Sequence, residues 1–189
     1  SEMCIRDRLE AIEFLLDSGR LAPEDVAMVQ VATPSRERLD DYRRTRQQVE
    51  AIVSRINGNH GSLGRSLIHY MHSGLPFEQI VALYTAADVM LITPLKDGMN
   101  LVAKEYVACH SDGSGALVLS EFAGAAPQLV QAYLCNPHDV DSIADALQLA
   151  IEDEPANKIR RMRQMWEHLQ DHDVNQWADA FLQQLREVE

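Results

Sequence analysis

Short apolar runs alternate along this chain with longer segments whose apolar residues recur at helical spacing. Runs rich in β-branched and apolar residues predict strands over residues 26–33, 66–71, 89–93, 115–122 and 132–136. Such continuously apolar runs suit strands that are buried on both faces, as in parallel sheets. We therefore expect an α/β fold, a doubly wound parallel sheet of the Rossmann-like kind with helices on both faces.

The segments between these runs predict the helices. Helical spacing covers residues 37–56 and 77–86, the latter with Ile80, Leu83 and Tyr84 inward, and a brief helical segment falls at 125–131. Gly58 stands where a left-handed C-cap would end the first helix. After Pro137, a helix capped by Asp139 or Asp141 precedes two further amphipathic helices. Their apolar faces carry Ile143, Leu147 and Ile151, then Ile159, Met162, Trp166 and Leu169, and finally Val174, Trp177, Phe181 and Leu185.

Composition limits the classes of protein that fit. The chain has 189 residues, 46% of them hydrophobic, which is enough for one sizeable core. Its formal net charge of -12 disfavours non-specific binding to nucleic acid or to an anionic membrane. No stretch approaches the roughly 18 apolar residues of a membrane span, and no secretory signal is visible. The three cysteines lack metal-site or redox spacing, so we expect buried free thiols and a reducing, cytoplasmic location.

The most informative stretch is LITPLKDGMNLVAKEYVA, residues 91–108, which leaves a predicted strand and opens a helix. In doubly wound sheets, ligands bind beyond the carboxyl ends of the strands. The N–H groups of a helix start can hold a phosphate or hydroxyl oxygen, and Gly98 would let a ligand approach the backbone. Asp97 could accept hydrogen bonds from hydroxyl groups, and Glu105, about two turns into the helix, suits vicinal ribose hydroxyls. Spacing alone equally allows a helix cap, a turn glycine and a solvated charge.

Further motifs identify a family. The run TPLKDGMNLVAKEYVA closely resembles the nucleotide-sugar signature of the trehalose-phosphate synthases. Other stretches resemble blocks of that family in the same order: VATPSR (31–36), RINGNHGSLG (55–64), LYTAADVMLITPL (83–95), VLSEFAGAA (118–126), NPHDVDSIADAL (136–147) and DVNQWADAFLQQL (173–185). The resemblance covers about residues 8–189.

The resemblance implies the carboxyl-terminal, nucleotide-sugar-binding lobe of a retaining GT-B glycosyltransferase. Such enzymes move glucose from UDP-glucose, a substrate, to glucose 6-phosphate, giving trehalose 6-phosphate and UDP without a metal or other cofactor. It implies that Arg36 binds the acceptor phosphate and Glu105 the ribose. The donor glucose would contact Asp97, Gly98, Met99 and Asn100, and the diphosphate the backbone of Leu101 and Val102. No catalytic residue is assigned to this lobe, and self-association into a homo-oligomer is compatible with the resemblance.

Three departures limit these expectations. The amino-terminal lobe of the family has no counterpart here, so we expect the chain alone to be inactive and the missing lobe to be its partner. Residues 1–7 match nothing in the family, where an R-L-D-Y-x-K-G loop clamps the diphosphate, and we interpret them as a leader of the kind that translated adapter sequence would give. Residues 8–189 form the donor-binding lobe. Phe77 stands where relatives often carry a basic residue near the base.

Other interpretations remain open. A related GT-B synthase could use the same donor with another acceptor, giving glucosylglycerol phosphate or a pseudo-glycosyl product. A non-catalytic nucleotide-sugar-binding domain could retain the fold without turnover. His168 and His172 have metal-ligand spacing on a helix, but without a third ligand a solvated helix end is the better interpretation.

Overall fold

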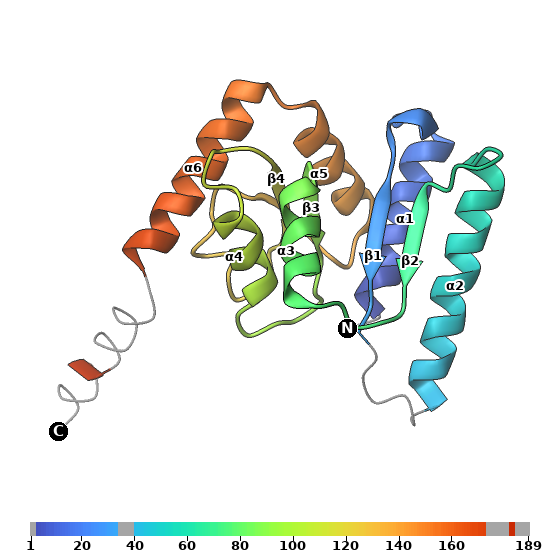
Figure 1. Cartoon of the computed structure of the whole chain (residues 1–189), viewed down its shortest axis with the longest axis horizontal. Coiled ribbons are helices and arrows are strands. Elements are labelled where there is room, and N and C mark those ends of the chain that lie inside the picture. The colour runs from blue at the N-terminus through green and yellow to red at the C-terminus, as the bar shows by residue number, and fades with distance from the viewer. Residues whose placement is uncertain (1–2, 34–39, 173–181, 184–189) are drawn as a thin grey trace.

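The computed structural model of the chain describes residues 3–33, 40–172 and 182–183 (Figure 1). Its helices are α1 (Met3–Asp17), α2 (Asp40–His60), α3 (Phe77–Ala86), α4 (Leu101–Ala108), α5 (Val140–Glu152) and α6 (Pro155–Asp171), with a short 3-10 helix η1 (Pro23–Asp25). Its strands are β1 (Met28–Val31), β2 (Ile68–Met71), β3 (Val89–Ile92), β4 (Ala116–Ser120) and β5 (Tyr133–Cys135). Each predicted strand therefore contains an observed one, with shorter bounds.

All strand pairs among the described residues are parallel, which confirms the α/β class. The strands form two ladders, β1 with β2, and β3 with β4 and β5 in that order. In the register, Met28 lies opposite Ile68, Val89 opposite Ala116, and Val118 opposite Tyr133. Within the described ranges no ladder joins β1 to β3, so the expected single sheet is interrupted between these two strands.

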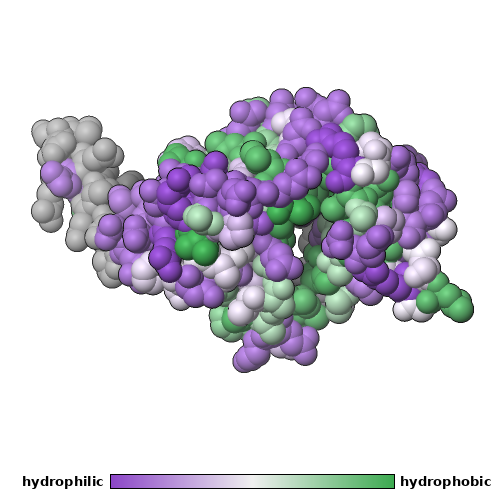
Figure 2. All heavy atoms as spheres, turned by 90° about the horizontal axis from the view of Figure 1, so that it is seen from above, coloured by the Kyte–Doolittle hydropathy of each residue, from purple (hydrophilic) through white to green (hydrophobic). Residues whose placement is uncertain are grey.

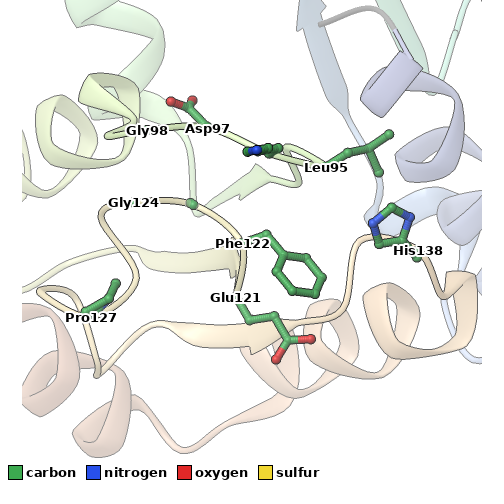
Figure 3. Close-up of a pocket in the computed structure, with 10 residues that line it drawn as sticks. Leu95, Asp97, Gly98, Glu121, Phe122, Gly124, Pro127 and His138 are labelled. Carbon is green, nitrogen blue, oxygen red and sulfur yellow. The ribbon is translucent and has the colours of Figure 1, made fainter.

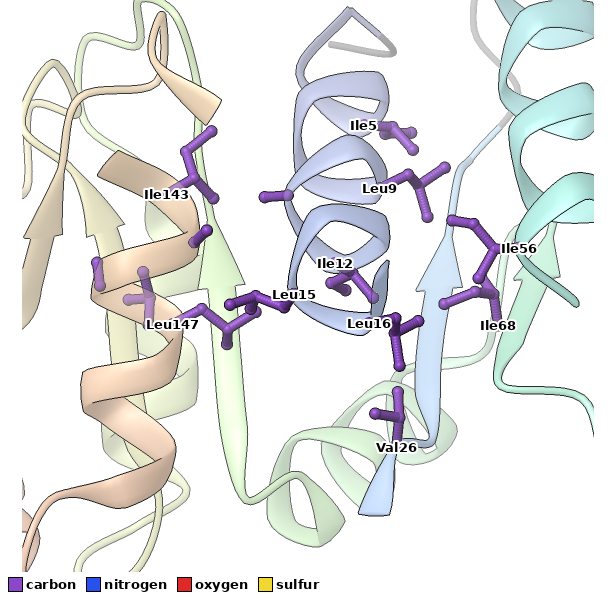
Figure 4. Packing of buried hydrophobic residues seen from close by; sticks show 14 of the residues in the cluster. Ile5, Leu9, Ile12, Leu15, Leu16, Val26, Ile56, Ile68, Ile143 and Leu147 are labelled. Carbon is purple, nitrogen blue, oxygen red and sulfur yellow. The ribbon is translucent and has the colours of Figure 1, made fainter. Parts of the chain in front are cut away.

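Helices cover both faces of the strands. On one face α1, α2 and α5 share one hydrophobic cluster with residues of both ladders, and α1 contributes Leu9 and Leu15, both fully buried (Figure 4). On the other face, α4 and α6 pack on β3 and β4 through a second cluster that includes Tyr106 and Met162. All five residues of β4 are buried, as expected for a central parallel strand. This packing on both faces fixes the positions of β3, β4 and β5, and with them the carboxyl ends of these strands.

Three of the elements differ from the sequence-based expectations. Helix α1 was not predicted, although Ile5, Leu9 and Ile12 bury one face of it. Residues 125–131 form successive turns instead of a helical segment. Strand β1 is not buried on both faces, because the Val29 side chain is 45% exposed.

Gly58 does not end α2. The helix continues to His60, and the Gly58 φ is not in the left-handed region, which the chain instead enters at Gly64 with φ 80°. The side chain of Asn57 accepts hydrogen bonds from the backbone N–H groups of Leu67 and Ile68, both at 2.9 Å. This clamp fastens the last turn of α2 to the start of β2.

Helix α5 begins as predicted, with Asp139 rather than Asp141 as its cap, since the Asp139 carboxylate accepts from the Asp141 N–H at 3.0 Å. The predicted closing helix with Val174, Trp177, Phe181 and Leu185 falls on residues that lie outside the described ranges.

Candidate functional site

Two loops meet at the carboxyl ends of β3 and β4. One is the corner around Lys96 to Asn100, between β3 and α4, and the other follows β4 through Phe122 to Gly124. Asp97 and Ala123 form an isolated parallel bridge. The N–H of Gly124 donates to the Asp97 carbonyl at 2.8 Å, and the Asp97 N–H donates to the Phe122 carbonyl at 3.4 Å. The corner is therefore held by the neighbouring strand's loop.

Gly124 permits this contact. A Cβ atom added at Gly124 would overlap the carbonyl group of Gly98 and crowd the backbone nitrogen of Met99. A Cβ atom at Gly98 would meet nothing within 4 Å. The close approach of the two loops thus depends on Gly124, while Gly98 leaves open space beside the corner for another molecule.

The side chains of Asp97 and Asn100 fix the start of α4. One Asp97 carboxylate oxygen accepts from the Met99 N–H at 3.1 Å, and the other accepts from the Asn100 side-chain amide at 2.9 Å. Asn100 is the N-cap, and its side-chain oxygen accepts from the Ala103 N–H at 2.9 Å. Asn100 has φ 75° and ψ 82°, the left-handed region, which asparagine tolerates better than most residues.

This capping leaves specific groups available at the helix start. The first N–H groups of a helix have no intrahelical partner, and Asn100 satisfies the one on Ala103, so those of Leu101 and Val102 remain for a ligand. The side chains of Met99, Leu101 and Val102 are 49%, 59% and 40% exposed. A helix start with two unpaired donors and a partial positive charge is suited to an anion.

A hollow of about 630 Å³ opens below the corner (Figure 3). A volume of this order can accept a sugar-sized ligand. The aromatic rings of Phe122 and His138 meet edge to face, with centroids 5.7 Å apart. In Figure 3 the Asp97 carboxylate points away from Phe122. The hollow is lined by Leu95, Lys96, Asp97, Gly98, Glu121, Phe122, Ala123, Gly124, Pro127 and His138.

Glu105 lies apart from the hollow, on the second turn of α4. Its side chain is exposed and accepts a hydrogen bond from the Tyr84 hydroxyl of α3 at 3.2 Å. Partial burial, and next the charge of Glu105, raise the pKa of Tyr84 to about 12. The neutral hydroxyl therefore orients the Glu105 carboxylate across the whole ordinary pH range.

The structure thus divides the residues that the sequence singled out. Asp97 and Gly98 line the hollow, whereas the exposed start of α4 and Glu105 do not. Arg36 lies outside the described residues. Sequence reasoning assigned no role to Phe122, Gly124 or His138, although they fall in the quoted blocks 118–126 and 136–147. The available signal was a glycine next to a predicted strand end.

Other sequence-based expectations concern features away from the site. The rings of His168 and His172 stack with centroids 4.0 Å apart, and the described residues contain no group of three His, Cys, Asp or Glu able to hold a metal. Cys109 and Cys135 are free, and burial raises the pKa of the Cys135 thiol to about 12. Among the described helices, none has the length and apolar content to cross a membrane.

The fold and the candidate site together define a parallel α/β lobe with a hollow between loops at the carboxyl ends of its strands, which is where ligands bind in sheets of this kind. The sequence model of Glycosyltransferase family 20 matches residues 3–187. This chain belongs to that family.

Known proteins agree with this assignment. The trehalose-6-phosphate synthase of Mycolicibacterium vanbaalenii is 52% identical over 182 residues, which are 96% of this chain and 37% of that protein. An α,α-trehalose-phosphate synthase (UDP-forming) from Burkholderia xenovorans, solved with glucose-6-phosphate, superposes with a TM-score of 0.90 at 38% identity, covering 97% of this chain and 40% of the other. The structure from E. coli bound with UDP-2-fluoro glucose superposes with a TM-score of 0.90 at 37% identity. The match covers 96% of this chain and 41% of the other. The chain thus spans about two fifths of these relatives and has the GT-B fold of one of their lobes.

Proposed function

We propose that this chain is the donor-binding lobe of an α,α-trehalose-phosphate synthase. In that reaction glucose passes from UDP-glucose to glucose 6-phosphate with retention of anomeric configuration, and trehalose 6-phosphate and UDP are released. The observation that carries the proposal is the start of α4, where the Asp97 and Asn100 side chains present the N–H groups of Leu101 and Val102 beside a sugar-sized hollow.

The donor site is assigned as part of this proposal, and the geometry supports it. The N–H groups of Leu101 and Val102 bind the diphosphate, and Glu105 binds the ribose hydroxyls in the orientation that Tyr84 fixes. The donor glucose contacts Asp97, Gly98, Met99 and Asn100 beside the hollow. Each Asp97 oxygen already accepts one hydrogen bond from the corner, and a carboxylate oxygen can accept a second from a sugar hydroxyl.

The same groups assist bond cleavage. When the bond between the anomeric carbon and the diphosphate oxygen breaks, the electron pair leaves with UDP and negative charge grows on the diphosphate. Fixed N–H donors at a helix start stabilise that charge without reorganising. Any group that positions the acceptor hydroxyl belongs to the remainder of the longer protein, apart from Arg36, to which we assign the acceptor phosphate.

The remaining properties are part of the proposal. The reaction needs no metal or other cofactor, the protein works in the cytoplasm, and a second lobe completes the cleft. The chain by itself has no useful transferase rate. The partial charge of the helix start supports anion binding despite the net charge of -12.

The direct test uses the parent protein, obtained by recovering the coding sequence around this chain. It should release UDP from UDP-glucose only with glucose 6-phosphate present. Glu105→Ala should raise KM for UDP-glucose at least about tenfold and leave KM for glucose 6-phosphate unchanged, and Arg36→Ala should do the reverse, since each removes contact with one substrate. UDP release with glycerol phosphate instead, or an inverted pattern of KM changes, would contradict the assignment, as would a normal rate from this chain alone.

A further inference from the structure

Asn57, Asp97 and Asp112 each stand directly before a glycine. In such a pair the glycine nitrogen can attack the carbonyl carbon of the preceding side chain, because glycine has no Cβ to hinder the approach. The product is a cyclic succinimide, and its hydrolysis leaves either aspartate or isoaspartate in the main chain. The folded structure determines which of the three pairs is open to this chemistry.

The Asn57–Gly58 pair is held inside a helix. Both residues belong to α2, where backbone N–H groups are engaged in the helical ladder. The Asn57 side-chain oxygen accepts from the N–H groups of Leu67 and Ile68, and its amide group donates to the Ile68 carbonyl, all at 2.9 Å. This side chain is therefore committed to the start of β2.

The Asp112–Gly113 pair is protected at its nitrogen. Gly113 is buried, and its N–H donates to the His110 carbonyl at 2.9 Å. The Arg163 side chain lies 3.1 Å from the place where a Gly113 Cβ would stand. Hydrogen bonds from Ser114 lower the pKa of the Asp112 carboxyl, and an ionised carboxylate resists attack. Exposure of Asp112 to water does not distinguish it, because hydrophilic residues cover much of the surface in Figure 2.

The Gly98 nitrogen, by contrast, is open. Gly98 is exposed, and among the described residues no group accepts a hydrogen bond from its N–H. A Cβ atom at this position would meet nothing within 4 Å. This nitrogen can therefore react without any local opening of the fold.

The Asp97 carboxyl group is held beside that nitrogen. One of its oxygens accepts from the N–H of Met99, the residue after Gly98, at 3.1 Å, so the carboxyl group lies along the Gly98 peptide. The Asn100 side-chain amide donates to the other oxygen at 2.9 Å. Two fixed partners reduce the conformational entropy that the approach of carboxyl carbon and nitrogen would otherwise cost.

We propose that the Asp97–Gly98 pair is a site of spontaneous isoaspartate formation. The Gly98 nitrogen forms a bond to Cγ of the protonated Asp97 carboxyl group, and the carboxyl hydroxyl leaves with the amide proton as water. A water molecule then opens the succinimide. Attack at Cγ restores aspartate, whereas attack at the main-chain carbonyl carbon breaks its bond to the Gly98 nitrogen and leaves isoaspartate. The two steps need no oxidant and no reactant other than water.

Isoaspartate would change the corner of the candidate site. The main chain would pass through Cβ and Cγ of residue 97, which lengthens it by one carbon, and the former main-chain carbonyl would become the free carboxylate. The Gly124 N–H donates to that carbonyl at 2.8 Å, and Met99 and Asn100 donate to the present carboxylate. These contacts position the start of α4, so a modified chain should lose affinity for UDP. That loss rests on the proposed function, whereas the modification rests on the geometry alone.

The test incubates the 189-residue chain in warm, mildly acidic heavy-oxygen water, with circular dichroism to verify that it stays folded. Peptide mapping by mass spectrometry then locates the incorporated oxygen and the isoaspartate. Isoaspartate should accumulate at least about tenfold faster at residue 97 than at residue 112, because only Gly113 needs local opening. In urea, which removes the protection of Gly113, the two rates should agree within about threefold.

A variant separates chemistry from folding. Gly98→Ala adds a methyl group beside the attacking nitrogen and meets open space in the structure, so it should slow the reaction at residue 97 at least about tenfold and leave residue 112 unchanged. Equal rates at residues 97 and 112 in the folded chain, or an unchanged rate in Gly98→Ala, would overturn the proposed modification.

The effect on binding is measured on the aged sample, in which modified molecules should give separate amide signals for Leu101 and Val102. Addition of UDP should shift the signals of the unmodified molecules and leave those of the modified ones in place. A UDP response of the modified molecules equal to that of the unmodified ones would overturn the effect on the site. If isoaspartate forms at residue 97 but unmodified molecules do not respond to UDP, the proposed donor site fails and the modification is upheld.

Discussion

The Asp97 carboxylate accepts a hydrogen bond from the Asn100 side-chain amide, with 2.9 Å between Oδ2 and Nδ2. Asn100 in turn caps α4 through Ala103 while its backbone is in the left-handed region. Asp97 belongs to the corner of the candidate site. Through Asn100 it therefore also helps to determine where the first N–H groups of α4 point. Binding and local stability are coupled at this corner.

Substitution of Asn100 should separate its two contributions. Asn100→Ala loses the cap, which costs about 1 kcal/mol, and places alanine at φ 75°, which costs about 1 kcal/mol more. Asn100→Gly loses the cap but tolerates the backbone, so its cost should be less than about 1 kcal/mol. Urea unfolding measures both. Equal losses for the two variants would show that the left-handed backbone carries no cost.

Gly124→Ala should disrupt the contact between the two loops. Its Cβ would overlap the Gly98 carbonyl, which is backbone and cannot rotate away, so a loss of about 1–3 kcal/mol is expected in thermal or urea unfolding. Gly98→Ala is the matched control, because it meets open space and has no positive φ, and should change stability by less than about 0.5 kcal/mol. A Gly124→Ala variant as stable as Gly98→Ala would exclude the packing described for the corner.

The Tyr84 hydroxyl should lose its proton at a higher pH than an ordinary tyrosine. Its pKa is raised to about 12 by burial and by Glu105, so its folded-state value lies above the ordinary value near 10. The associated stability is complete below pH 10 and is lost as the pH rises from about 10 to 12. Burial also raises the pKa of Tyr106 and of Tyr133, so several tyrosines should ionise late. Absorbance titration of tyrosinate should show an ionisation near pH 12 that Tyr84→Phe removes and Glu105→Gln shifts to lower pH. An unshifted curve for Glu105→Gln would mean that the Tyr84–Glu105 hydrogen bond does not form.

Much of the fold was predictable from local patterns. Continuously apolar runs located all the described strands, since a parallel strand buried between helices is mostly apolar, as the four residues from Ala116 to Leu119 of β4 are. The start of α5 followed from the ordinary chemistry of a helix start, which left Asp139 and Asp141 as the candidate caps, and Asp139 is the cap. The end of α2 did not follow, because Asn57 fastens it through β2, a contact between segments that the sequence pattern does not reveal.

The candidate site was predictable at its centre and not at its margins. Motif spacing located the corner because a strand end, a glycine and a helix start adjoin in sequence. It could not show that Asp97 supports Asn100, which is the actual cap, nor that Gly124 from another loop is required for the corner's position. The interruption between β1 and β3 was equally hidden, since strand order is a property of the whole sheet and not of any single run.

The central claim is that the start of α4 binds the diphosphate of a UDP-sugar. The most direct measurement is a heteronuclear NMR titration of the chain with UDP up to about 5 mM, a range that detects binding free energies near −4 kcal/mol. The amide signals of Leu101 and Val102 should shift along a common saturation curve, and Asn100→Ala should weaken that binding while the Leu134 amide stays unmoved. If the Leu101 and Val102 amides do not shift, or shift no more than Leu134, the start of α4 is not the diphosphate site.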